Sequence, residues 1–202
     1  MTPRPDVSEE RRAQIIEAAL ACFTRLGYVN TTMDEIAAAS GLSKGAIYWY
    51  FDSKDTLFRA AASSVLERVV ETSLAATTDC ETATERFRVG AACMVDVCRE
   101  MECYFALVVE FWTQSEQRDE ATRFWADIIR EYRRAVAAVL EAGIEGGEFR
   151  SVDTQALSWM IMAAYDGLTA YHMMMPDLDM DRISEGFIDA LLKGVQADGE
   201  LQ

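Results

Sequence analysis

Apolar residues repeat at helical spacing along nearly the whole chain, and this periodicity constrains the fold more than any other feature. Ile16, Leu20 and Phe23, for example, fall about one turn apart, so one stripe of a helix can bury all three. Alternating runs of β-branched residues, which would indicate strands, are almost absent. The pattern predicts an all-α protein, and 202 residues with 50% hydrophobic content allow one large domain or two small ones.

Two helix-capping signals close together indicate a helix-turn-helix near the N-terminus. Thr32 and Glu35 have the spacing of a capping box, which opens one short helix. Gly41 suits the turn after it, Ser43 can cap the next helix, and Asp52 can cap the helix that follows. Two short helices joined by such a turn are typical of domains whose second helix enters the DNA major groove.

Four consecutive aromatic residues, Tyr48–Phe51, lie in the second of these helices. A helix cannot bury four neighbours on one face, because successive residues are turned by about 100°. Ile47 and Phe51 are one turn apart and can pack against the other helices, whereas Gly45 and Trp49 point roughly the other way. Some of these rings must therefore face another molecule.

Duplex DNA is the partner that this surface suits best. Small side chains at Gly45 and Ala46 allow the backbone to approach a groove closely. Lys44 can donate to guanine O6 and N7, and the methyl group of Ala46 can contact a thymine methyl. These three residues are therefore expected to lie at the bases.

Phosphate contacts are expected on both sides of the groove. The hydroxyls of Tyr48 and Tyr50 can bind phosphates, as can Lys54 and the helix N-terminus at Thr32. The alternative interpretation is a small aromatic core patch with two solvated lysines. Charge does not exclude DNA binding, since residues 1–59 hold seven Lys or Arg and eight Asp or Glu, and nearly all of the net charge of −15 lies beyond them.

The rest of the chain reads as a larger helical domain. The periodicity predicts helices at 82–100, 102–114, 118–142, 153–173 and 180–196, with breaks at the glycines from Gly143 to Gly147 and at Pro176. The stretch from Ala156 to Tyr171 is apolar on nearly every face, so more than one side of it must be covered. The last helix carries an apolar stripe that can join it in a dimer interface, namely Ile183, Phe187, Ile188, Leu191 and Val195.

Two acidic residues stand inside apolar segments of this larger domain. Asp166 and Glu110 each need a partner there, which is either an Arg or Tyr of the chain or a cationic ligand. Aromatic residues on the central helices can form a pocket wall or ordinary core. The candidate ligand-binding residues are Phe105, Glu110, Phe111, Trp112, Phe124, Trp125, Trp159, Tyr165 and Asp166.

The sequence carries no pattern of an enzyme or of a metal site. It has one histidine, no Gly-rich phosphate loop and no clustered metal ligands, so we expect no catalytic residues, no metal and no cofactor. The N-terminal segment is polar, which favours the cytoplasm over secretion, and no stretch suits a membrane span. Alternatives remain a helical interaction protein, or a redox- or metal-sensing regulator that uses Cys22, Cys80, Cys93, Cys98 or Cys103.

The segment GYVNTTMDEIAAASGLSKGAIYWYFDSKDTLF resembles the N-terminal DNA-binding segment of the TetR family of transcriptional regulators. The likeness covers roughly the first sixty residues. Among its matched positions are Thr31 and Thr32, Gly41 to Ser43, Gly45, the aromatic residues Tyr48–Phe51, and Lys54.

The resemblance implies a helix-turn-helix domain over 1–54 and a ligand-binding and dimerisation domain over 55–202. It implies a homodimer that binds a palindromic double-stranded operator and holds a small-molecule inducer, here expected to be mostly apolar. Carried over by position, the DNA-facing residues are Thr32, Ser43, Lys44, Gly45, Ala46, Tyr48, Trp49, Tyr50 and Lys54.

Overall fold

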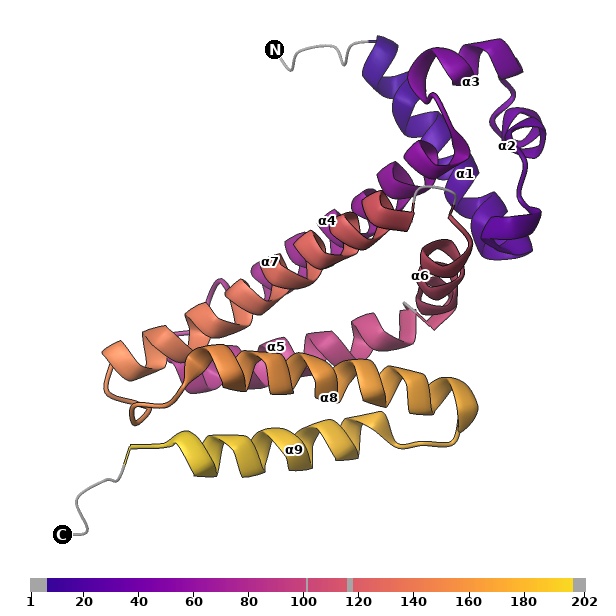
Figure 1. The fold of residues 1–202 in the computed structure, drawn as a ribbon. Helices are drawn as coiled ribbons and strands as arrows, with labels where there is room; N and C mark the ends of the chain where they lie inside the picture. The colour runs from indigo at the N-terminus through magenta and orange to yellow at the C-terminus, as the bar shows by residue number, and fades with distance from the viewer. Residues whose placement is uncertain (1–6, 101, 116–117, 198–202) are drawn as a thin grey trace, which may run out of the picture. The chain divides into compact units, whose positions relative to one another are not determined.

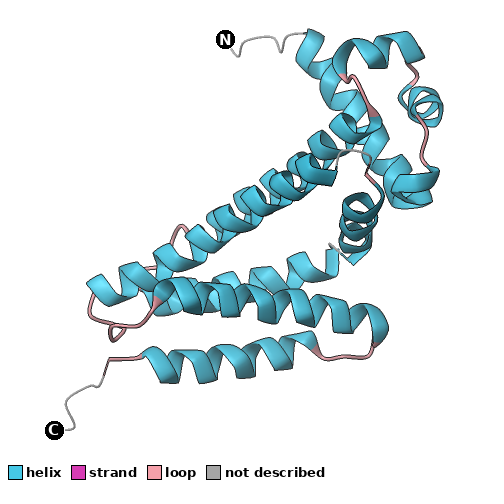
Figure 2. Ribbon diagram, in the orientation of Figure 1, coloured by secondary structure: helices cyan, strands magenta, loops and turns pink. Residues whose placement is uncertain are grey.

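The computed structural model describes residues 7–100, 102–115 and 118–197, and in this part of the chain helices are joined by loops with no strand (Figure 2). The helices, labelled in Figure 1, are α1 (Val7–Asn30), α2 (Met33–Ser40), α3 (Lys44–Tyr50), α4 (Lys54–Thr77), α5 (Ala83–Glu100), α6 (Glu102–Gln114), α7 (Arg118–Glu145), α8 (Thr154–Met174) and α9 (Met180–Val195). The expected all-α class is confirmed, and the predicted helices beyond residue 80 agree within a few residues.

The helices form two compact units. The first consists of Met1–Arg68 and Cys103–Phe124, and the second of Val69–Glu102 and Trp125–Gln202. Helices α4 and α7 therefore each contribute residues to both units. All of α6 except Glu102 belongs to the first unit, although it is distant from α1–α3 in the sequence. The domain boundary at residue 54 concerns function and stays a prediction.

The predicted caps build the helix-turn-helix of the first unit. Thr32 and Glu35 form the capping box at the start of α2, and Gly41 ends that helix in a left-handed conformation with φ 69°. Ser43 accepts the backbone N–H of Ala46 and caps α3. The cap of α4 was expected at Asp52 but is Ser53, which accepts the backbone N–H of Thr56 at 3.1 Å.

Helix α1 is interrupted at Gly27, where a stop was expected. Its φ of 80° and ψ of 166° lie outside the helical region, in a conformation that L residues with a side chain rarely adopt. The chain turns there and places the ring of Tyr28 in an aromatic cluster of the first unit. The other members of this cluster are Phe23, Phe58 and Phe111, with ring centroids 4.4–6.0 Å apart.

The second unit has its core between α5, α8, α9 and the end of α7. On α9, Ile188, Leu192 and Val195 are buried in this core, and α5 is the helix that α9 contacts most. Ile188 and Val195 of the stripe predicted to face a second copy thus belong to the chain's own core, whereas Ile183 of the same stripe is exposed. Sequence periodicity identifies an apolar face but not its partner.

Glycines shape the connection between α7 and α8. Gly143 was expected to end the helix, but α7 continues to Glu145, and Gly147 ends it with φ 74°. Gly143 is needed for close packing instead, since a Cβ atom there would lie 2.1 Å from the ring of Phe149. Phe149 is buried in the core of the second unit.

Glu148 caps α5 from this connection. Its carboxylate accepts the backbone N–H groups of Ala83 at 2.7 Å and Thr84 at 3.0 Å, and the Thr84 hydroxyl at 2.8 Å. The hydrogen bond from Ala83 is the largest cause that lowers the pKa of the Glu148 carboxyl below its ordinary value, and those from Thr84 lower it further. The contact joins the end of α7 to the start of α5.

We predict that Glu148→Gln destabilises the protein by about 0.5–2 kcal/mol at neutral pH, as expected for loss of a helix cap. A depressed pKa in the folded state stabilises the protein above the pKa of the unfolded carboxyl, and the stabilisation is lost as the pH falls through the folded-state value. Urea unfolding of both proteins at descending pH should therefore show the difference shrinking in acid. The exposed Glu145→Gln is the control, and a difference that stays constant with pH would contradict this role.

Candidate DNA-binding surface and ligand-binding residues

Helix α3 and its C-cap residue Phe51 divide their large side chains between core and surface as predicted. Ile47 and Phe51 are buried, whereas Tyr48 is 43% exposed and Trp49 is 74% exposed. Tyr50 is half-buried, and its ring packs edge-on against Trp49 with centroids 4.6 Å apart. Adjoining exposed aromatic rings, rather than one such side chain alone, indicate a surface that can receive a partner.

Beside these rings the surface is bare. Gly45 is exposed, and a Cβ atom built on it would meet nothing within 4 Å. Ala46 is half-buried and Ser43 is exposed. The Thr32 hydroxyl is exposed too, and it donates to Glu35 at 2.9 Å within the capping box. The chain's own side chains therefore leave space for close approach at the N-terminal end of α3.

Lys44 begins α3 with its ammonium group hydrogen-bonded to α2. Its Nζ lies 2.8 Å from Oδ2 of Asp34, and both side chains are exposed. This hydrogen bond raises the pKa of Lys44 above its ordinary value, so the ammonium is charged at neutral pH. The sequence reading placed Lys44 correctly on the exposed surface but did not identify Asp34 as its partner.

Lys54 has an internal role that the sequence did not suggest. Its ammonium donates to the backbone carbonyls of Tyr28 at 2.8 Å and Val29 at 3.3 Å, and lies 4.4 Å from the centre of the Tyr28 ring. It therefore satisfies carbonyl groups at the end of α1. A phosphate contact by Lys54 stays a prediction, and it would compete with these bonds.

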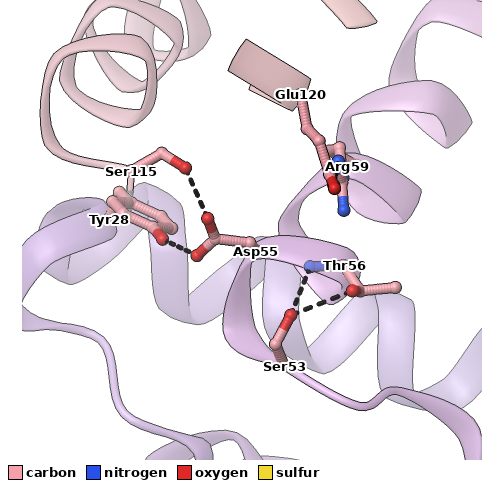
Figure 3. Close-up of polar contacts among 7 residues, drawn as sticks. All are labelled: Tyr28, Ser53, Asp55, Thr56, Arg59, Ser115 and Glu120. Carbon is pink, nitrogen blue, oxygen red and sulfur yellow. Dashed lines mark hydrogen bonds and ion pairs between the residues drawn. The ribbon is translucent and has the colours of Figure 1, made fainter. Parts of the chain in front are cut away.

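Tyr28 also binds a buried carboxylate (Figure 3). Its hydroxyl donates to Asp55, near the start of α4, and the Ser115 hydroxyl donates to the other oxygen of that carboxylate. Asp55 is buried, so these hydrogen bonds replace those it would make with water. Nearby, Arg59 of α4 forms an ion pair with Glu120 of α7 at 2.8 Å.

Glu110 of α6 binds the backbone at the same end of α1. Its carboxylate accepts the backbone N–H of Tyr28 at 2.9 Å and that of Val29 at 3.0 Å. A Cβ atom on Gly27 would lie 3.0 Å from the same carboxylate, so a side chain there would crowd it. One candidate ligand-binding residue thus holds the end of α1. Apolar neighbours along α6 were the only signal in the sequence, and they did not reveal this acceptor role.

The other candidate ligand-binding residues of the first unit differ in environment. Phe111 is buried in the aromatic cluster, where it stacks on Phe58 with centroids 4.4 Å apart. Trp112 is exposed and donates its indole N–H to Thr122 at 3.0 Å. Phe124 is half-buried, and the side chain of Phe105 lies outside the described part of the structure.

Four candidates lie in the second unit. Tyr165 is buried and its hydroxyl lies 2.7 Å from that of Ser184 on α9, which joins α8 to α9. Trp125 is half-buried. Trp159 is about half exposed, with the guanidinium of Arg133 5.7 Å from its ring centre.

Asp166 was expected to be enclosed but is exposed in the single chain. Desolvation by its neighbours nevertheless raises its pKa above the ordinary value. Trp159 and Asp166 are seven residues apart, so they share a face of α8. Tyr165 instead belongs to the core and to the face that meets α9.

An apolar surface remains uncovered along α8. Exposed residues include Met160 and Tyr171, the latter 59% exposed. A hollow of about 360 Å³ lies between α8 and α9, and its lining includes Gly167, Leu168 and Ile183. No helix in the described ranges is both long and apolar enough to cross a bilayer. The uncovered surface is of the kind that a protein partner buries.

Comparison with known proteins connects these features. Residues 15–61 match the family model for bacterial regulatory proteins of the tetR family, and residues 102–193 match the C-terminal model of BetI-type transcriptional repressors. The HTH-type transcriptional regulator YfiR of Bacillus subtilis is 27% identical over 154 residues, which cover 73% of this chain and 72% of YfiR.

Two solved structures with bound ligands share the fold. A transcriptional regulator from Saccharomonospora viridis in complex with choline has a TM-score of 0.75 at 20% identity, covering 94% of this chain and 99% of that one. FadR from Bacillus subtilis in complex with stearoyl-CoA has a TM-score of 0.72 at 23% identity, covering 91% and 99%. Since the sequence motif of α2 and α3, both matched segments and the fold agree, the chain belongs to the TetR family of transcriptional regulators.

Proposed function

We propose that this regulator binds a palindromic operator as a homodimer and represses transcription until a small, mostly apolar inducer releases it. The exposed face of α3 is the observation that carries this proposal. Lys44, Gly45, Tyr48 and Trp49 are all exposed there, on a helix whose opposite face is buried. Lys44 and Ala46 are assigned to base edges, and Tyr48 and Tyr50 to phosphates.

The uncovered face of α8, with its neighbours on α9, supports the homodimer. Met160, Tyr171 and Ile183 are exposed apolar residues on these helices. A second copy of the chain would bury them in a four-helix bundle. Two α3 helices about 34–36 Å apart could then enter successive major grooves of a palindrome.

The inducer is proposed to bind the face of α8 that carries Trp159 and Asp166. An aromatic ring and a carboxylate in partly desolvated surroundings suit an apolar molecule with a cationic group. The structural relatives bound to choline and to stearoyl-CoA show that this fold accommodates a cation in one case and a long acyl chain in another. Arg133, beside Trp159, would serve an anionic ligand instead.

Helix α6 offers a route from ligand to DNA. Glu110 binds the two peptide N–H groups that follow Gly27, and Phe111 packs on Tyr28 and Phe58. A ligand that prefers a different position of α6 would therefore disturb the end of α1, and α1 is the helix on which α2 packs. Helix α4 contributes residues to both units and is a second element proposed to transmit the change.

A redox-sensing function has less support from the described cysteines. Cys22 and Cys98 are buried. Burial raises the pKa of the Cys98 thiol, which reduces the reactive thiolate at neutral pH.

The DNA-binding assignment predicts two distinct phenotypes. Lys44→Ala should lower the preference for one base pair by about 1–3 kcal/mol, because a bidentate contact to guanine is lost. Tyr48→Phe should weaken all duplexes alike, because a phosphate contact carries no sequence information. The operator is first selected from random duplexes, and the affinities of both variants for single-base changes in that operator are then measured. Equal weakening of every sequence by Lys44→Ala would contradict a base contact.

Tyr171→Glu should convert the dimer into monomers, because it puts two charges into an apolar interface. Tyr171 is exposed in the single chain, so the fold itself should survive, which circular dichroism can verify. Light scattering after size-exclusion chromatography gives the mass, with the exposed Ala138→Glu on α7 as control. A variant that stayed dimeric would place the interface elsewhere.

Lipophilic cations should release operator DNA more effectively than neutral hydrophobes or fatty-acid-like anions of similar size. Asp166→Asn should abolish the advantage of the cations, because the amide removes the charge and keeps the shape. Fluorescence anisotropy of labelled operator measures the release. Selective release by anions, unchanged in Asp166→Asn, would reject the cationic inducer and favour Arg133 as its partner.

A further inference from the structure

The ion pair between Asp34 and Lys44 lies at the helix that is proposed to read bases. Lys44 is the first residue of α3, and Asp34 is in the first turn of α2. Nζ of Lys44 and Oδ2 of Asp34 are 2.8 Å apart. The Lys44 side chain is 49% exposed and the Asp34 side chain is 69% exposed. An exposed pair of this kind contributes little to folding stability, so its effect should be sought in binding.

We propose that Asp34 is a positioning residue that increases the sequence discrimination of α3 by holding Lys44. This inference rests on the proposed DNA-binding function of α3. Asp34 acts in one way on the correct operator and in another way on all other DNA.

On the correct operator, the pair orders Lys44 in advance. A lysine ammonium has three N–H donors, and Asp34 engages one of them, so others remain for a guanine edge. A free lysine side chain loses rotamer entropy when it is fixed on a base. Because the pair already restrains Lys44 in the DNA-free protein, less of that entropy is lost on binding.

On other DNA, the pair suppresses a general attraction. Non-specific binding comes mainly from lysine and arginine charges that release counterions from phosphates. The carboxylate of Asp34 neutralises Lys44 locally and is itself repelled by phosphates. Lys44 therefore adds little affinity for DNA that lacks a guanine at the correct position. The protein discriminates between sequences because its complex with the wrong DNA is weakened.

A purely structural role for Asp34 makes a different prediction. An acid in the first turn of α2 also interacts favourably with the helix dipole, and its removal would loosen α2. Loosening should lower affinity for all DNA, whereas release of Lys44 should raise affinity for non-specific DNA. The sign of the change in non-specific affinity therefore separates the two roles.

Asp34→Asn is the test, with binding measured on the selected operator and on a scrambled duplex over a range of salt concentrations. We expect affinity for the scrambled duplex to rise about two- to fivefold more than affinity for the operator, as the energy of an exposed ion pair suggests. The salt dependence on scrambled DNA should steepen by about one released counterion. Asp34→Glu should restore most of the discrimination.

Two controls assign the effect to Lys44. Asp52→Asn removes an exposed charge from the same unit at a carboxylate that Lys44 does not contact, so it should leave the ratio of affinities near that of the wild type. In a Lys44→Ala background, Asp34→Asn should no longer change the ratio.

An unchanged ratio in Asp34→Asn, or the same change with Lys44 absent, would overturn the role of Asp34 and leave the proposed function intact. If the wild-type protein selected no preferred sequence from random duplexes, that result would overturn both the proposed function and this inference.

Discussion

Two consecutive peptide N–H groups at the end of α1 donate to a single carboxylate on α6, and the first unit depends on this contact. Gly27 makes it possible, because its positive φ turns the chain where a helix would otherwise continue. The ammonium of Lys54 donates to carbonyl groups of the same short segment, and the carboxylate of Asp55 accepts the Tyr28 hydroxyl. The segment thus binds α4 and α6 at once, and α2 packs on the helix that carries it.

This arrangement gives a physical basis for the proposed response to a ligand. Tyr28 lies in the segment matched by the DNA-binding family model, and Glu110 lies in the segment matched by the C-terminal model. Their contact therefore joins two parts of the sequence that two different family models match. The hydrogen bond from Tyr28 is partly buried, which strengthens it relative to an exposed one, whereas the bond from Val29 is exposed. Loss of Glu110 would leave two N–H groups without this acceptor.

Local signals allowed the sequence to predict the helices and the exposed face of α3. The caps at Thr32 and Ser43, the turn at Gly41 and the outward rings of α3 each depend on residues within a few positions. Contacts between distant residues could not be predicted in this way. Glu110 is 82 residues from Tyr28, and Lys54 is 26 residues from it. The apolar stripe of α9 was recognised, but the burial of Ile188 and Val195 in the chain's own core depends on tertiary packing that periodicity does not encode.

Amide hydrogen exchange in Glu110→Gln tests most directly whether this carboxylate holds the end of α1. The amide side chain keeps one acceptor and replaces the other by an N–H group, so protection of the Tyr28 and Val29 amides should fall about tenfold or more. Amides of α8 should be unaffected. Glu120→Gln, which removes the charge of Glu120 from its partly exposed ion pair with Arg59, should leave Tyr28 and Val29 protected. Unchanged protection of Tyr28 and Val29 in Glu110→Gln would contradict the account.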